Sequence, residues 1–338
     1  MRSVLLLLLL PSAFAAAPPL QTASLGDLKL ESGEVLRNCR IGYRTFGSLN
    51  AAKSNAVLFP TWFSGRSDDL AQFMAADGLV NPARYFAIAV DALGDGVSSS
   101  PSNSAEQPRM RFPKFTIRDM VTAEYRLVKE VLGIPRLHAV MGISMGGMQT
   151  FQWVLSYPDF VERAVPIVGS PRLTSTDLLL WTAEADAITE SAGWNGGNYQ
   201  NMPSLRSVGE MHAFALTTPA YRARSTPADD FPAFLKGIDD APLGRTDAGD
   251  WLRQLQAMMS LDVSKPFGES LARAARTVKA KVLIVVAKQD HMVNPLSALE
   301  FAAAIGAPII QLESDCGHLS PGCEKDTLYP RVRAFLDQ

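Results

Sequence analysis

A single serine stands between two pairs of small residues in the stretch VMGISMGGM, residues 140–148. Gly142, Ser144 and Gly146 match the pattern Gly-x-Ser-x-Gly, in which the serine occupies the tip of a sharp turn from a strand into a helix. The glycines are required because a Cβ atom at their positions would strike the neighbouring backbone. A serine presented in this way can attack an acyl carbon once a base removes its proton. The short pattern also occurs by chance, so the prediction depends on the rest of a triad.

An acid and a base follow the serine along the chain. Asp290 comes directly after the apolar run 280–289, and His318 lies in the loop that follows a second run, 307–312. Both residues are therefore expected at the carboxyl ends of strands, where the serine turn also opens. We predict that Ser144 is the nucleophile, that His318 is the general base, and that Asp290 orients the base and stabilises its imidazolium form.

Other histidines and acids are less suited to these roles. His138 precedes the strand before the turn, His212 lies in a helical segment, and His291 adjoins Asp290, where it can at most line a pocket. We interpret all three as structural histidines. The competing acids are Asp91, Asp95 and Asp315. The first two follow an earlier strand, and the third is too close in sequence to His318 to reach it from an adjacent strand end.

A serine nucleophile also needs donors for the oxyanion of its tetrahedral intermediate. We predict that one donor is the backbone N–H of Met145, the residue after the nucleophile. The second is expected from the loop after the apolar strand at 55–60, at Trp62 or Phe63. The side chains of these two aromatic residues are also candidates for the pocket wall or the core.

Strand-like and helix-like segments alternate around these residues. Apolar runs predict β segments at 25–44, 55–60, 85–91, 136–142, 160–168, 280–290 and 307–312. Helical periodicity or composition predicts helices at 116–134, 146–158 and 327–338. This serial order is typical of an α/β fold with a mostly parallel central sheet and helices on both faces.

With these motifs in place, the chain resembles the homoserine O-acetyltransferase family of α/β-hydrolases. The resemblance covers nearly all residues after the N-terminal segment. The matching segments are LESGEVLRNCRIGYRTFGSLNAAKSNAVLFPTWFSG, GISMGGMQTFQWVLSYPDFVERAVPIVGS, WNGGNY, DHMVNP and CGHLSPGCE. The resemblance implies an α/β-hydrolase fold, a helical lid, and a triad of Ser144, Asp290 and His318 that forms an acyl-enzyme. The predicted organisation is a hydrolase core at 18–171, a helical lid at 172–276 and the second part of the core at 277–338.

Two segments depart from the pattern of that family. Residues 91–104, DALGDGVSSSPSNS, replace a Gly-x-Cys-Leu-Gly-Ser-type segment. The lid segment VGEMHAFALTTPAYR, residues 208–222, has no arginine at the point that serves the amino-acid carboxylate in the family, and Arg206 and Arg222 are displaced candidates. These departures favour an esterase-like acyl hydrolase over transfer to homoserine.

The N-terminus has the pattern of a secretory signal peptide. Residues 1–17, MRSVLLLLLLPSAFAAA, combine Arg2, a short apolar run and two Ala-x-Ala cleavage sequences. The apolar run is too short to span a membrane, so no stable membrane insertion is expected after cleavage. We predict a secreted or periplasmic protein, a location that also disfavours a reaction dependent on cytoplasmic acetyl-CoA.

The chain has three cysteines, Cys39, Cys316 and Cys323. The last two bracket His318, and in an oxidising compartment they can form a small disulfide loop that leaves Cys39 unpaired. Three free, mostly buried thiols are an equally acceptable interpretation of the sequence.

Composition excludes several classes of partner. The 32 basic and 34 acidic side chains nearly balance, and they form no basic block that would bind nucleic acid.

No metal-ligand spacing is present, so we expect neither a metal nor a cofactor, and the expected partner is a small-molecule acyl substrate. The sequence leaves open whether the protein forms a homodimer. The preferred function is a serine acyl hydrolase, the alternative is an acyltransferase with the same ping-pong chemistry, and a non-catalytic binding protein is the third hypothesis.

Overall fold

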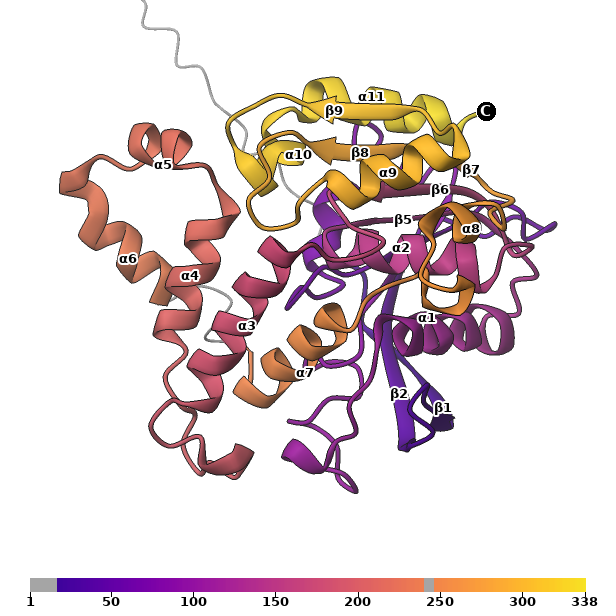
Figure 1. The fold of residues 1–338 in the computed structure, drawn as a ribbon. Helices are drawn as coiled ribbons and strands as arrows, with labels where there is room; N and C mark the ends of the chain where they lie inside the picture. Colours follow the sequence, from indigo (N-terminus) through magenta and orange to yellow (C-terminus); the bar gives the residue numbers. More distant parts are fainter. Residues whose placement is uncertain (1–16, 240–245) are drawn as a thin grey trace, which may run out of the picture.

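A central, mostly parallel sheet organises the molecule (Figure 1). The computed structural model describes residues 17–239 and 246–338, so nearly all of the predicted signal peptide lies outside the described residues. The strands are β1 Gln21–Lys29, β2 Val35–Phe46, β3 Ala56–Pro60, β4 Phe86–Val90, β5 Leu137–Ile143, β6 Val161–Ile167, β7 Lys281–Val282, β8 Ile284–Ala287 and β9 Ile309–Leu312.

The strand order is β1-β2-β4-β3-β5-β6-β8-β9, and β7 pairs with β6. The pairs β1–β2 and β2–β4 are antiparallel, whereas all the other pairs are parallel. Strand β3 is buried at every position, as are the last four residues of β4. Continuous burial of this kind is typical of parallel strands that are covered on both faces.

Helices cover both faces of the sheet, as the sequence predicted. On one face, α1 (Ile117–Arg126), α2 (Met145–Ser156) and α9 (Leu296–Ile305) contribute side chains such as Phe151 and Phe301 to one apolar cluster. On the other face, α11 (Lys325–Leu336) contributes Leu328 and Val332 to a second cluster. The predicted α/β architecture, a mostly parallel sheet with helices on both faces, is therefore confirmed.

The helix predicted at 116–134 differs in detail from the structure. It begins with a capping box between Thr116 and Asp119 and remains α-helical to Arg126. A π-helical turn, Leu127–Val131, follows. Gly133 then takes a φ of +62°, a left-handed conformation that favours glycine and ends the helix.

A second group of helices lies between β6 and β7. These are α3 Ser175–Thr189, α4 Arg206–Leu216, α5 Pro219–Ser225, α6 Phe231–Asp239, α7 Ala248–Met259 and α8 Leu271–Ala275. In Figure 1, α3 to α6 form a layer beside the sheet, whereas α7 lies closer to it. We call α3 to α7 the lid helices. Among the described residues, no helix is long and apolar enough to cross a membrane.

Candidate active site

The turn that carries Ser144 is built by close backbone contacts. Ser144 links β5 to α2 and has a φ of +58°, a strained conformation for a residue with a side chain. A Cβ atom at Gly142 would lie 2.3 Å from backbone atoms of Gly146, and one at Gly146 would lie 2.6 Å from the Pro60 carbonyl oxygen. The amide of Ser144 also donates to the Ile167 carbonyl at 2.9 Å. These contacts leave only glycine at both flanking positions.

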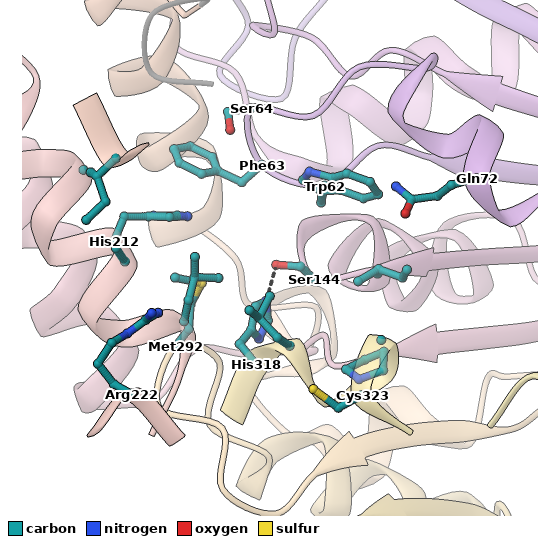
Figure 2. A pocket seen from close by; sticks show the side chains of 18 of the residues that line it. Trp62, Phe63, Ser64, Gln72, Ser144, His212, Arg222, Met292, His318 and Cys323 are labelled. Carbon is teal, nitrogen blue, oxygen red and sulfur yellow. Dashed lines mark hydrogen bonds between the residues drawn. The ribbon is translucent and has the colours of Figure 1, made fainter. Parts of the chain in front are cut away.

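The three residues predicted as a triad lie together. The Nδ1 atom of His318 is 2.7 Å from Oδ2 of Asp290, and its Nε2 atom is 2.9 Å from Oγ of Ser144 (Figure 2). The other oxygen of Asp290 accepts from the amides of Met292 and Val293 at 2.9 Å each. Because an ionised carboxylate only accepts, Nδ1 carries the hydrogen and Nε2 is left to accept from the serine hydroxyl. All three triad side chains are buried.

The segment that carries His318 is held from two sides. Cys316 and Cys323 form a disulfide that encloses the histidine, and Cys39 is free and buried. Burial raises the pKa of the Cys39 thiol to about 12. On the lid side, Gly317 packs so closely on α4 that a Cβ atom there would lie 3.1 Å from the Leu216 carbonyl oxygen.

The predicted oxyanion donors lie at the residue after the serine and in the loop after β3. Met145 is the first residue of α2, so its N–H has no carbonyl partner within the helix. The Trp62–Gly65 turn closes with a backbone hydrogen bond of 3.0 Å, and the amide of Ser64 donates to Oε1 of Gln254 at 2.9 Å. Gln254 belongs to α7, so a lid helix fixes the loop from which the second donor was predicted.

Ser144 and His318 open into a cavity of about 920 Å³. Most of its wall is apolar or aromatic, with contributions from Trp62, Phe63, Phe73, Ile143, Trp181, Leu216, Phe234, Trp251 and Met292. The lid contributes two polar side chains to the same wall, His212 and Arg222. The arrangement suits a small ester with an apolar body and leaves room for a polar substituent near the lid.

The competing acids lie elsewhere. Asp91 accepts from the amide and hydroxyl of Ser67 at 2.7 Å each, and burial raises its pKa. Burial and the charge of Asp91 hold the pKa of Asp95 well above its usual value. Asp315 pairs with Arg224, which lowers the pKa of Asp315.

The competing histidines do not reach Ser144 either. The Nε2 atom of His138 lies 2.8 Å from the Leu336 carbonyl oxygen, near the start of β5, whereas Ser144 follows the end of that strand. His291 is exposed and does not line the cavity, although the sequence left that role open to it.

The two displaced arginines differ in position. Arg206 pairs with Glu210 one turn along α4, and both side chains are exposed. Arg222 lines the cavity, where its guanidinium donates to the hydroxyls of Thr217 and Thr226 and lies 4.1 Å from the centre of the Phe234 ring. Of the two candidates, only Arg222 is placed to meet a substrate in this cavity.

His212 was interpreted as a structural histidine, yet it lines the cavity. Its Nδ1 atom lies 3.1 Å from Oε1 of Glu184, which is fully buried. Neither residue stands at a recognisable spacing in the sequence. Their pairing is set by the packing of α3 against α4, which is a tertiary contact and leaves no local signal.

Comparison with known proteins places this fold and cavity in a family. A family model for the alpha/beta hydrolase fold matches residues 57–321. The chain belongs to this family. It is 33% identical to a probable esterase of Corynebacterium glutamicum, with 95% of each chain covered. It is 32% identical to an ethyl acetate hydrolase of Pseudomonas veronii, with 81% of each chain covered.

The predicted likeness to homoserine O-acetyltransferases is confirmed. The chain is 30% identical to such an enzyme from Methanococcoides burtonii, with 87% of this chain and 68% of the relative covered. Among solved structures, the acetyl esterase MekB superposes with a TM-score of 0.89 at 29% identity, with coverage of 95% of this chain and 98% of the other. The protein is therefore an enzyme, a hydrolase or acyltransferase of the α/β-hydrolase class.

Proposed function

We propose that the protein is a secreted serine hydrolase that cleaves small carboxylic esters through a covalent acyl-enzyme. The observation that carries the proposal is the continuous chain of hydrogen bonds from Asp290 through His318 to Ser144, which ends at the wall of an apolar cavity. An apolar, partly closed cavity admits an ester and strengthens the electrostatic interactions that stabilise its transition state.

The proposed reaction has two halves. In the first, Oγ of Ser144 attacks the ester carbonyl while Nε2 of His318 takes its proton, and the oxyanion accepts from the amides of Met145 and of Trp62 or Phe63. His318 then donates that proton to the departing alkoxide, and the acyl group stays on Ser144. In the second half, His318 takes a proton from water, the resulting hydroxide attacks the acyl carbon, and Ser144 leaves with its proton restored. Asp290 stays ionised and holds the imidazole throughout.

Hydrolysis is preferred to transfer because of the lid. The lid segment 208–222, which is expected to supply an arginine in homoserine acetyltransferases, has none at the matching point. Two similar proteins are named an ethyl acetate hydrolase and an acetyl esterase, which supports short acyl esters as the substrate class. Transfer of the acyl group to an alcohol is the second candidate, favoured by the similarity to homoserine O-acetyltransferases and by Arg222 in the cavity wall.

Two further properties belong to the proposal. Export is supported by the signal-like residues 1–17 and by the Cys316–Cys323 disulfide, because disulfides persist in oxidising compartments. Fractionation of cells that express the full chain is expected to place the shortened protein outside the cytoplasm.

A homodimer is supported by apolar side chains exposed on the lid, chiefly Leu179 and Phe214. Light scattering of the purified protein measures its oligomeric state.

Product analysis distinguishes hydrolysis from transfer. Purified protein receives butyl acetate with and without homoserine, beside a Ser144→Ala control, and mass spectrometry measures acetate and O-acetylhomoserine. The proposal predicts acetate that depends on Ser144 in both conditions. Formation of O-acetylhomoserine as the main product would contradict hydrolysis and support the transferase.

A further inference from the structure

Opposite the triad, the lid carries a second pair of a histidine and a carboxylate. Glu184 of α3 is fully buried, and its two oxygens accept from different partners. One oxygen lies 3.1 Å from Nδ1 of His212, and the other accepts from the indole N–H of Trp251 at 3.1 Å. Because the carboxylate only accepts hydrogen bonds, Nδ1 of His212 carries its hydrogen, and the ring is fixed in one orientation.

Aromatic neighbours hold the imidazole from the sides. Its centre lies 5.7 Å from the ring of Phe63, 6.2 Å from Trp181 and 5.4 Å from Trp251. Phe63 belongs to the loop from which an oxyanion donor was predicted. The imidazole is therefore held by aromatic side chains of two lid helices and of the loop after β3.

The other ring nitrogen faces the cavity. The side chain of His212 lines the cavity and is 19% exposed. Figure 2 shows the imidazole directed into the cavity, toward the side that holds Ser144. Across residues 17–239 and 246–338, Nε2 of His212 has no hydrogen-bond partner. The atom is not fully buried. An oriented polar atom thus meets the substrate in a mostly apolar wall.

We infer that His212 recognises a hydroxyl group on the substrate, several atoms away from the ester carbonyl. This inference rests on the proposed ester hydrolysis. A neutral imidazole with its hydrogen on Nδ1 offers a lone pair at Nε2, which a hydroxyl group can satisfy and a methyl group cannot. A hydroxyl can also accept, so the contact persists when the imidazole gains a second proton. The substrate class is a short-chain ester with a free hydroxyl in its alcohol or its acyl part.

Two pairs of nearly isosteric esters test this inference. The first pair, 3-hydroxybutyl acetate and 3-methylbutyl acetate, carries the variable group in the alcohol part. The second pair, ethyl 3-hydroxybutanoate and ethyl 3-methylbutanoate, carries it in the acyl part. For each pair the readout is the ratio of kcat/KM for the hydroxyl ester to kcat/KM for the methyl ester. The pair with the larger ratio in the unmodified protein tells which part of the substrate reaches His212.

Two substitutions separate recognition from packing. The amide nitrogen of His212→Asn falls near the place of Nδ1, so it keeps the bond to Glu184 and removes the cavity-facing nitrogen. His212→Gln is the matched control, because its longer side chain returns an amide to the position of Nε2. We expect the ratio to fall about five- to tenfold in His212→Asn, the loss of one neutral hydrogen bond, and to stay within about threefold in His212→Gln.

Three outcomes overturn the inference: a ratio that does not change in His212→Asn for either pair, an equal fall in both variants, and a fall caused by faster cleavage of the methyl ester. Failure of the proposed function is visible separately. In that case the unmodified protein cleaves none of the four esters in a Ser144-dependent manner. Within each variant the methyl ester is the reference, so a general loss of activity cancels from the ratio.

Discussion

The sheet and the lid position their functional side chains by different means. Ser144, Asp290 and His318 follow the strands β5, β8 and β9, and the close backbone contacts of Gly142 and Gly146 leave the serine turn little freedom. His212 and Glu184 lie within lid helices and are oriented by side chains from other helices. The sheet therefore carries the three triad side chains, with support from the lid at Gly317 and at the loop after β3, and in our proposal the lid selects the substrate.

The strongest test of this division removes the nucleophile. Ser144→Ala is expected to lower kcat on butyl acetate by ~10³-fold or more, because no other group can form the acyl-enzyme. His212→Asn should lower turnover of the methyl esters by no more than about threefold. Steady-state kinetics on both variants measure the contrast. Comparable losses in the two variants would mean that catalysis and substrate recognition are not separated between the sheet and the lid.

The acid of the triad should give the next largest effect. Asp290→Asn keeps the shape of the side chain but weakens its hydrogen bond with the imidazole N–H of His318. We therefore expect kcat to fall by ~10²–10⁴-fold. The matched substitution in the lid is Glu184→Gln, which changes the other histidine–carboxylate pair and should alter substrate preference more than kcat. Near-full activity of Asp290→Asn would refute its assignment.

Added methyl groups compare the rigidity of the two regions. Gly142→Ala places a Cβ atom 2.3 Å from backbone atoms of Gly146, so the turn must deform, at a cost of ~1–3 kcal/mol in the free energy of unfolding. Gly237→Ala in α6 is the control, because no atom lies within 4 Å of its added Cβ. We expect this lid variant to unfold at an equal or higher temperature. Thermal unfolding measures both variants. Equal shifts in their unfolding temperatures would contradict the predicted difference in rigidity.

The disulfide around His318 shows how far the catalytic base depends on support from outside the sheet. Its removal in the double variant Cys316→Ser/Cys323→Ser frees the loop that carries the base, with an expected loss of stability of about 2 kcal/mol for a loop of this length. We expect kcat to fall several-fold while KM changes little, since the lid still forms the cavity wall. Reduction of the unmodified protein should have the same effect. An unchanged kcat would mean that the sheet alone positions His318.

The smallest predicted effect concerns pH. Burial raises the pKa of Asp250 of α7 to about 7, and its carboxylate accepts from the amide and hydroxyl of Ser102. Because the pKa is higher in the folded than in the unfolded protein, this group contributes stability at low pH that is lost as pH rises toward 7. Asp250→Asn should flatten the fall in unfolding temperature between about pH 4 and pH 8. An identical pH dependence in both proteins would contradict this assignment.

The sequence predicted the sheet-borne residues because each has a local signature. Gly-x-Ser-x-Gly occurs at a strand-to-helix junction, and the acid and base follow apolar runs that become β8 and β9. The strands themselves were recognisable because buried parallel strands are continuously apolar.

The lid was harder to interpret for a physical reason. Its helical composition was visible, but the orientation of each helix depends on contacts with other elements. Nothing near His212 distinguishes it from a structural histidine, because its partner Glu184 lies on another helix. The same is true of Gln254, which reaches the loop after β3 across a separation of 190 residues.

The most direct test of the central claim is covalent labelling of the nucleophile. A fluorophosphonate is added to the unmodified protein and to Ser144→Ala, His318→Ala and His212→Asn, and intact-mass and peptide mass spectrometry locate the adduct. The structure predicts one rapid adduct on Ser144, none in Ser144→Ala, a strongly slowed reaction in His318→Ala, and nearly normal labelling in His212→Asn. An adduct on another residue, or equal labelling rates with and without His318, would contradict the assigned triad.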